Sequence, residues 1–176
     1  MPVFETTTSD PLQMYICFLP ASQELQDIHW LNRAAAYVSG SNRPMIHTEL
    51  LFAEQSNDNE IIGQSCSIHY NGNVFFEPKK FSRNEWHFRL CPWNVDKAMS
   101  FCKEHVGDGF NHVGYFMNPV CRARVTNDRW FCSEIVAGAL RAAGADVETS
   151  LHPHALYESL KNITIPACPR NPNMDF

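Results

Sequence analysis

Four short segments with the composition of β-strands follow one another in the middle of the chain, and this feature constrains the fold most. Turn-forming residues separate them, including "EQSNDNE" between the first two and Asn71-Gly72 after the second. Strands that are joined by short turns pair antiparallel. The pattern therefore predicts a small antiparallel sheet at the centre of the fold, built from residues 45–53, 61–70, 73–76 and 85–91.

Elements on either side of these strands make the chain a mixture of α and β structure. The apolar run at 14–19 predicts one more, buried strand. Apolar residues at helical spacing, together with capping residues, predict helices. These helices cover about residues 22–38, 95–106, 131–143 and 154–161. We expect an α+β fold whose Pro- and Asn-rich tail after residue 165 is irregular.

Length and charge limit the kinds of protein that the chain can form. With 176 residues and 44% hydrophobic content, it can bury one core and is too short for two full-sized domains, so we expect a single domain over 1–176. A net charge of -5 without a basic run argues against nucleic acid as a partner. Neither a signal peptide nor a membrane-spanning apolar stretch is recognisable, which predicts a soluble, cytoplasmic protein. The sequence leaves the oligomeric state open.

Cysteine spacing excludes two common uses of cysteine. The chain has seven, an odd number, and no two of them form a C-x-x-C pair. This argues against a disulfide framework and against a four-cysteine zinc site. We expect neither a metal nor another cofactor, and we expect most of these thiols to be reduced and buried: Cys17, Cys66, Cys91, Cys102, Cys121, Cys132 and Cys168.

Cys132 differs from the others because of its place in the sequence "NDRWFCSEIVAGALRAAG". The apolar spacing after it predicts that it lies in the first turn of a helix. There, unpaired N–H groups and the positive end of the helix dipole favour a thiolate. A nucleophilic cysteine needs this environment, although a small buried side chain would also fit the position. A nearby base would favour the nucleophile.

His47 is the candidate base among eight histidines. It lies near the start of a predicted strand, where Ile46 and Leu50 mark one face and His47 and Glu49 share the other. A polar pair on one face of a strand indicates a functional surface. Taken by itself, the same position also suits a histidine on an edge strand.

Together, these residues resemble the circularly permuted branch of the papain-like fold, within the NlpC-related superfamily of cysteine peptidases and amidases. In the ordinary branch the cysteine helix precedes the histidine strand, and here the order is reversed. The resemblance covers about residues 14–165. It is carried by "IHTELLF", "GQSCSIHYNGNVFF", "FNHVG", "WFCSEIVAGAL" and "HPHALYESL".

The resemblance implies a papain-like core in which a small antiparallel sheet packs against the helix that carries the cysteine. It implies a thiol hydrolase in which Cys132 attacks an amide, peptide or isopeptide carbonyl, His47 acts as its base and a thioester acyl-enzyme forms. The backbone N–H of Cys132 would be an oxyanion donor. The partner would be a peptide or another amide-containing substrate.

Two alternatives to a hydrolase remain open. Other permuted papain-like proteins use the same pair as lipid acyltransferases or phospholipases. These enzymes commonly carry a hydrophobic anchor, and none is recognisable here, so a hydrolase is favoured. The third possibility is a non-catalytic binding module on the same fold.

The residue that orients His47 depends on how the next strand pairs. A two-residue turn at Asn57-Asp58 would place positions 64, 66 and 68 on the face of His47, and a shift by one residue would substitute 65, 67 and 69. We predict Gln64, whose amide oxygen can accept from the imidazole N–H. The alternatives are Ser67, His69 and Glu49. Glu49 lies two residues from His47 along the same strand, and a neighbour at that distance more often points past the ring.

Three further positions fall within the matching motifs. We expect Asn111 and Gly114 of "FNHVG" to shape the wall of the cleft. Phe110 stands where relatives often carry tyrosine, so a hydroxyl at that position is absent. Glu134 follows Cys132 in the first helical turn, where the helix dipole is sufficient reason for a carboxylate.

Overall fold

The structure, a computed structural model, describes residues 12–22, 41, 43–117, 128–149 and 151–166. Its main feature is an antiparallel sheet in the order β4-β3-β2-β1-β5-β8. The short strands β6 and β7 form a separate parallel pair. The strands are β1 (Gln13–Pro20), β2 (Met45–Ser56), β3 (Glu60–Ile68), β4 (Val74–Ser82), β5 (His87–Leu90), β6 (Gly109–Phe110), β7 (Arg129–Trp130) and β8 (Ile165–Pro166).

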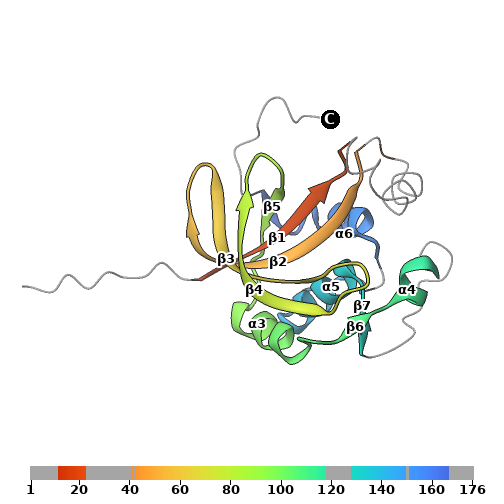
Figure 1. The fold of residues 1–176 in the computed structure, drawn as a ribbon. Helices are drawn as coiled ribbons and strands as arrows, with labels where there is room; N and C mark the ends of the chain where they lie inside the picture. The colour runs from red at the N-terminus through yellow and green to blue at the C-terminus, as the bar shows by residue number, and fades with distance from the viewer. Residues whose placement is uncertain (1–11, 23–40, 42, 118–127, 150, 167–176) are drawn as a thin grey trace, which may run out of the picture.

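Helices cover one face of this sheet, which makes the fold α+β. The described helices are α3 (Val95–Glu104), α4 (His112–Met117), α5 (Cys132–Ala142) and α6 (Pro153–Leu160). Figure 1 shows a strongly curved sheet with α3 and α5 together beneath it. Helix α5 packs against β2 and β3, and α3 packs against α5. The start of α5 is therefore held close to the central strands.

The sheet is buried on both faces. Between the sheet and the helices lies a large apolar cluster that includes Ile16, Leu50 and Ile135. A smaller cluster occupies the opposite, concave face, and it includes Cys17 and Leu51. Because successive side chains of a strand point to opposite faces, β1 and β2 contribute alternately to the two clusters. This explains why β1 is apolar at nearly every position rather than at every second one.

A β-bulge sets the register between β2 and β3. Leu50 pairs with Cys66 and Phe52 with Gln64, but the pairing shifts between Ala53 and Gln55, where Glu54 is the extra residue. Gly63 lies beside the bulge, and any Cβ there would overlap the carbonyl oxygen of Phe52. Glycine is required at this position because the two backbones approach so closely.

Most of the predicted elements within the described residues are confirmed. The strands at 14–19 and 45–53 and the helices at 95–106 and 131–143 all form, with small differences at their ends. The loop expected after Gly107 was wrong in part, since it contains β6 and α4. The helix predicted to follow Ser22 and the tail after residue 166 lie outside the described residues.

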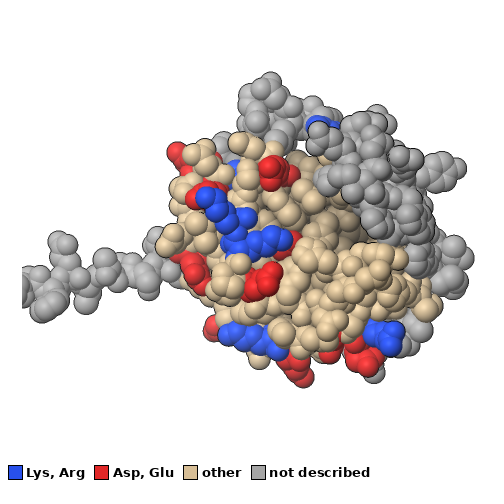
Figure 2. Space-filling view, viewed as in Figure 1, with Lys and Arg blue, Asp and Glu red and all other residues tan. Residues whose placement is uncertain are grey.

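Charged side chains on the face in Figure 2 are mixed in sign, with Lys and Arg lying among Asp and Glu. Within the described part of the chain, no helix is both long enough and apolar enough to cross a membrane. The mixed charges agree with a sequence that has a net charge of -5 and no basic run. The cytoplasmic location stays a prediction.

Candidate active site

Cys132 is the first residue of α5, as predicted from the apolar spacing after it. The preceding residue, Phe131, has the extended backbone of a helix N-cap. Phe131 has no polar side chain to cap the helix, and the Glu134 carboxylate instead accepts from the Phe131 backbone N–H at 3.2 Å. The same carboxylate oxygen accepts from the Asn111 side-chain amide at 3.2 Å. Glu134 therefore fixes the start of the helix, which is a structural role.

Asn111 connects α4 to the start of α5. Its side-chain oxygen accepts from the backbone N–H of Gly114 at 2.8 Å, while its amide reaches Glu134. A side chain at position 114 would overlap that of Asn111, which explains the glycine. These two residues of "FNHVG" hold α4 against the start of the cysteine helix.

His47 lies in β2, close enough to the side chain of Cys132 for the charges of the two groups to interact. The two residues predicted as nucleophile and base are therefore brought together from positions 85 residues apart in the chain. On its other side, Nε2 of His47 lies 3.2 Å from Oε1 of Glu49. Burial lowers the pKa of His47, but the negative charges of Cys132 and Glu49 outweigh it and raise the pKa to about 9. The surroundings of His47 thus favour the imidazolium.

Glu49 is fully buried and has three partners. Besides His47, its Oε1 is 2.5 Å from Nζ of Lys79, and its Oε2 accepts from the Ser65 hydroxyl at 2.7 Å. Burial by itself would raise the pKa of this carboxyl. The hydrogen bonds and charges of His47 and Lys79 lower it to about 2. A carboxylate that is ionised and held on both oxygens can orient the His47 ring.

Gln64 does not occupy the predicted place beside His47. It points to the opposite face of the sheet, where its side-chain amide donates to Glu54 at 3.3 Å. The physical reason is the bulge at Glu54, since it gives the β2–β3 register in which residues 65, 67 and 69 share the face of His47. Glu49, named as an alternative, is the residue that contacts the imidazole.

The other two alternatives have different surroundings. The Ser67 hydroxyl donates to the backbone oxygen of Thr48 at 2.7 Å, so it is engaged away from the ring. His69 stacks on His47 with ring centroids 5.4 Å apart, and it stacks on Phe75 at 4.9 Å. Burial and the charge of His47 lower the pKa of His69. His69 therefore covers the His47 ring as a neutral side chain.

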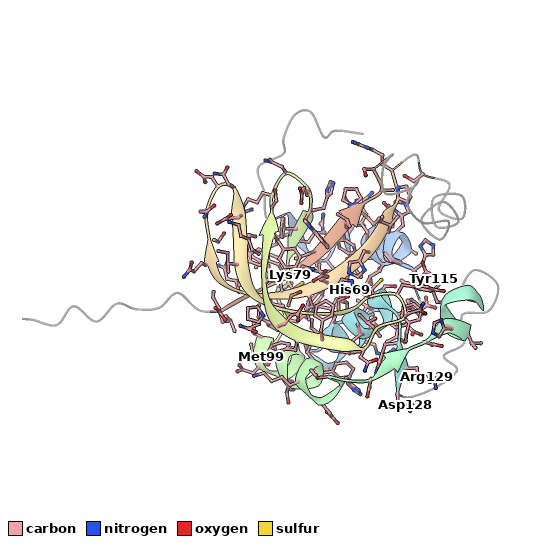
Figure 3. The ribbon with its side chains drawn as sticks, viewed as in Figure 1. His69, Lys79, Met99, Tyr115, Asp128 and Arg129 are labelled. Carbon is pink, nitrogen blue, oxygen red and sulfur yellow. The ribbon has the colours of Figure 1, made fainter. Side chains whose placement is uncertain are left out.

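Aromatic side chains surround the two reacting groups. The rings of Trp86 and His47 are arranged edge to face, with centroids 6.1 Å apart. On the cysteine side, Tyr115 packs against Phe131 at 5.8 Å and against Phe110 at 5.6 Å. Burial, Cys132 and Tyr70 together raise the pKa of Tyr115, so its hydroxyl stays protonated close to the thiol. Figure 3 labels Tyr115 at α4, together with His69 and Lys79.

Sequence reasoning missed Lys79 and included Ser65 only in an alternative register that it did not choose. Ser65 belonged to the shifted register, and the signal for Lys79 was weak. Two adjacent lysines in a strand must point to opposite faces, so one of Lys79 and Lys80 had to face inward if the segment continued as a strand. The predicted strand ended at residue 76, before this pair, whereas β4 continues to Ser82.

No cluster of metal-ligating side chains is present among the described residues. The five cysteines in this part of the chain are buried free thiols, while Cys121 and Cys168 lie outside it. The groups that the described residues bring to the site are the Cys132 thiol, the His47 imidazole and the Glu49 carboxylate, with the imidazole contacting the carboxylate.

Comparison of the chain with protein-family models, with curated proteins and with solved structures gives no match. The function proposed below is inferred from the geometry of the site and the chemistry of its residues.

Proposed function

We propose that the chain is a thiol hydrolase that cleaves an amide or peptide bond through Cys132 and His47. The observation that carries the proposal is the position of His47, which lies close enough to Cys132 for their charges to interact and contacts the buried Glu49 carboxylate. A nucleophile, a base and a third group that orients the base are the parts that acyl transfer requires. Their arrangement supports cysteine catalysis better than a purely structural role for Cys132.

The geometry suggests how the reaction proceeds. Nε2 of His47 faces Glu49, which leaves Nδ1 to take the proton of the thiol. The thiolate attacks the carbonyl carbon, and the backbone N–H of Cys132 at the start of α5 is suited to stabilise the oxyanion. The imidazolium then gives its proton to the leaving amine, and a thioester remains on Cys132. Water, deprotonated by His47, releases the acyl group and restores the thiol.

We further propose that this site stands on a permuted papain-like core. Support comes from the order of the elements: the histidine lies on β2 of an antiparallel sheet, and the cysteine opens a helix late in the chain that packs on β2 and β3. The bond cleaved in the substrate would be an amide, a peptide or an isopeptide bond.

The first experiment tests catalysis through the reactivity of Cys132. The rate of labelling by iodoacetamide is measured from pH 5 to 10 and assigned to Cys132 by peptide mass spectrometry. We expect rapid labelling well below pH 8 in the wild type, and its loss in His47→Ala. His87→Ala is the matched control, because His87 is another half-buried strand histidine that contacts Tyr157 instead of Cys132. A wild-type profile like that of an ordinary thiol would support a binding module instead.

The second experiment distinguishes the two classes of substrate. Cys132→Ser is incubated with a peptide mixture and, separately, with phospholipid vesicles, and the intact mass of the protein is measured. An acyl adduct derived from a peptide supports the proposed hydrolase. A fatty acyl adduct would identify the lipid acyltransferase or phospholipase alternative and overturn the preference for amides.

A further inference from the structure

Lys79 and Lys80 are adjacent in β4 and have opposite surroundings. Lys80 is 64% exposed in its side chain and pairs with Glu60 at the surface. Lys79 points to the concave face, where its side chain is 28% exposed and its ammonium contacts Glu49. Lys79 thus brings a positive charge to the carboxylate that contacts the candidate base.

Aromatic rings hold the Lys79 ammonium in place. Its Nζ lies 5.1 Å from the ring centroid of Phe81, 5.5 Å from that of Trp86 and 5.7 Å from that of Phe75. Aromatic faces attract a cation while displacing water from it, so the interaction with Glu49 is screened less than that of a surface pair. Trp86 and Phe75 also belong to the aromatic surroundings of His47 and His69.

Two groups can balance the negative charge of the Glu49 carboxylate, namely Lys79 and protonated His47. Oε1 of Glu49 is shared by Lys79 and His47, and Oε2 accepts from a neutral hydroxyl. A fully buried carboxylate requires a cationic partner to remain ionised. If Lys79 were neutral, His47 would be the cationic partner left in contact with Glu49, and the carboxylate would hold it as an imidazolium. General acid catalysis requires His47 to give up that proton.

We propose that Lys79 is a positioning residue that keeps Glu49 ionised when His47 is neutral. Glu49 can then orient the imidazole throughout the reaction cycle while it holds the His47 proton less tightly than it would without Lys79. This inference rests on the proposed function, because it assigns Lys79 a part in the proton transfers of His47. It identifies a Lys-Glu-His-Cys chain in place of a three-residue site.

Other titratable groups face His47 and Glu49 and must be considered. Cys132 comes from α5, and His69, which follows β3, stacks on the ring. Burial raises the pKa of the Cys17 thiol on β1, and the charge of the nearby Glu49 carboxylate raises it further. Cys17 and His69 are both kept neutral near pH 7. Lys79 is therefore the group whose removal changes the charge beside Glu49.

The test is the titration of His47, followed by NMR of its ring Cε1–H in a Cys132→Ser background. The resonance is assigned by its absence in His47→Ala. We expect Lys79→Gln to raise the pKa of His47 by roughly two units, the size expected for loss of a unit charge about 6 Å away at an effective dielectric constant near 20. Glutamine still donates to the buried carboxylate, so this variant is expected to fold.

Two further variants separate charge from structure. Lys79→Arg keeps the charge and is expected to leave the titration of His47 close to its parent value. Lys80→Met removes the neighbouring surface charge and should change it by no more than a few tenths of a unit. An unchanged His47 titration in folded Lys79→Gln would overturn the inference.

Labelling of Cys132 keeps this result distinct from failure of the proposed function. If wild-type Cys132 reacts as an ordinary thiol while Lys79→Gln still shifts the His47 titration, the proposed catalysis fails and the electrostatic coupling stands. If labelling is fast and dependent on His47 but the titration does not move, the hydrolase is supported and the role of Lys79 is overturned.

Discussion

The two faces of the β2–β4 sheet carry similar polar residues in very different surroundings. On the concave face, Glu49 is fully buried and contacts His47, Ser65 and Lys79. On the other face, Gln64 pairs with Glu54 in contact with solvent. Surface pairs contribute about 0–1 kcal/mol, whereas buried charges depend strongly on their partners. Burial, rather than residue type, separates the candidate site from an ordinary sheet surface.

The largest expected difference between the two faces is in how far the free energy of unfolding falls when a polar side chain is removed. Glu49→Ala leaves Lys79 facing the sheet interior without its carboxylate, and we expect it to lower the free energy of unfolding by about 3–5 kcal/mol. Gln64→Ala should change it by no more than about 0.5 kcal/mol. Urea denaturation of both variants measures the comparison. Equal effects would mean that the Glu49 cluster contributes no more than the surface pair.

A smaller effect is expected in the pH dependence of stability. Glu49 has a folded pKa of about 2 against an ordinary value of 4.5, so its contribution is present above pH 4.5 and is lost as the pH falls towards 2. His47 has a folded pKa of about 9 against 6.5, so its contribution is present below pH 6.5 and is lost as the pH rises towards 9. Stability from the site should therefore be greatest between about pH 4.5 and 6.5.

Thermal melts from pH 2 to 10 check this dependence. Glu49→Gln should flatten the acid side of the profile, and His47→Gln should flatten the alkaline side. Glu54→Gln is the control on the opposite face, where an exposed carboxylate should leave the acid side unchanged. A profile in Glu49→Gln that matches the wild type would contradict the depressed pKa of Glu49.

The smallest expected effect concerns the bulge at Glu54, which determines which residues of β3 share a face with His47. Gly63→Ala places a Cβ against the Phe52 carbonyl, and we expect it to lower the free energy of unfolding by roughly 1–3 kcal/mol. Gly72→Ala, in the turn after β3, should be tolerated better because its contacts with the His69 backbone are less close. Equal effects from the two substitutions, measured by urea denaturation, would show that the bulge can relax at no cost.

Local patterns predicted the elements that carry the two principal residues of the candidate site, and the resemblance to a permuted papain-like arrangement selected these residues as a pair. The apolar spacing after Cys132 fixed it at a helix start, and the strand pattern around His47 put it on one face with Glu49. Both are properties of neighbouring residues, so the sequence alone determines them. The choice of Gln64 was wrong because it depended on how β2 pairs with β3. One extra residue in the bulge moves Gln64 to the face opposite His47 and brings Ser65, Ser67 and His69 to the face of His47.

The sequence by itself determined an α+β chain with a sheet in the middle, a thiol at the start of a helix and a histidine on a strand. Only the tertiary structure decided that the two meet, that Glu49 faces the imidazole and that Lys79 reaches the same carboxylate. Secondary structure follows from interactions between residues close in sequence. The site depends on strand register and on the packing of α5 against β2 and β3, which join residues up to 85 positions apart.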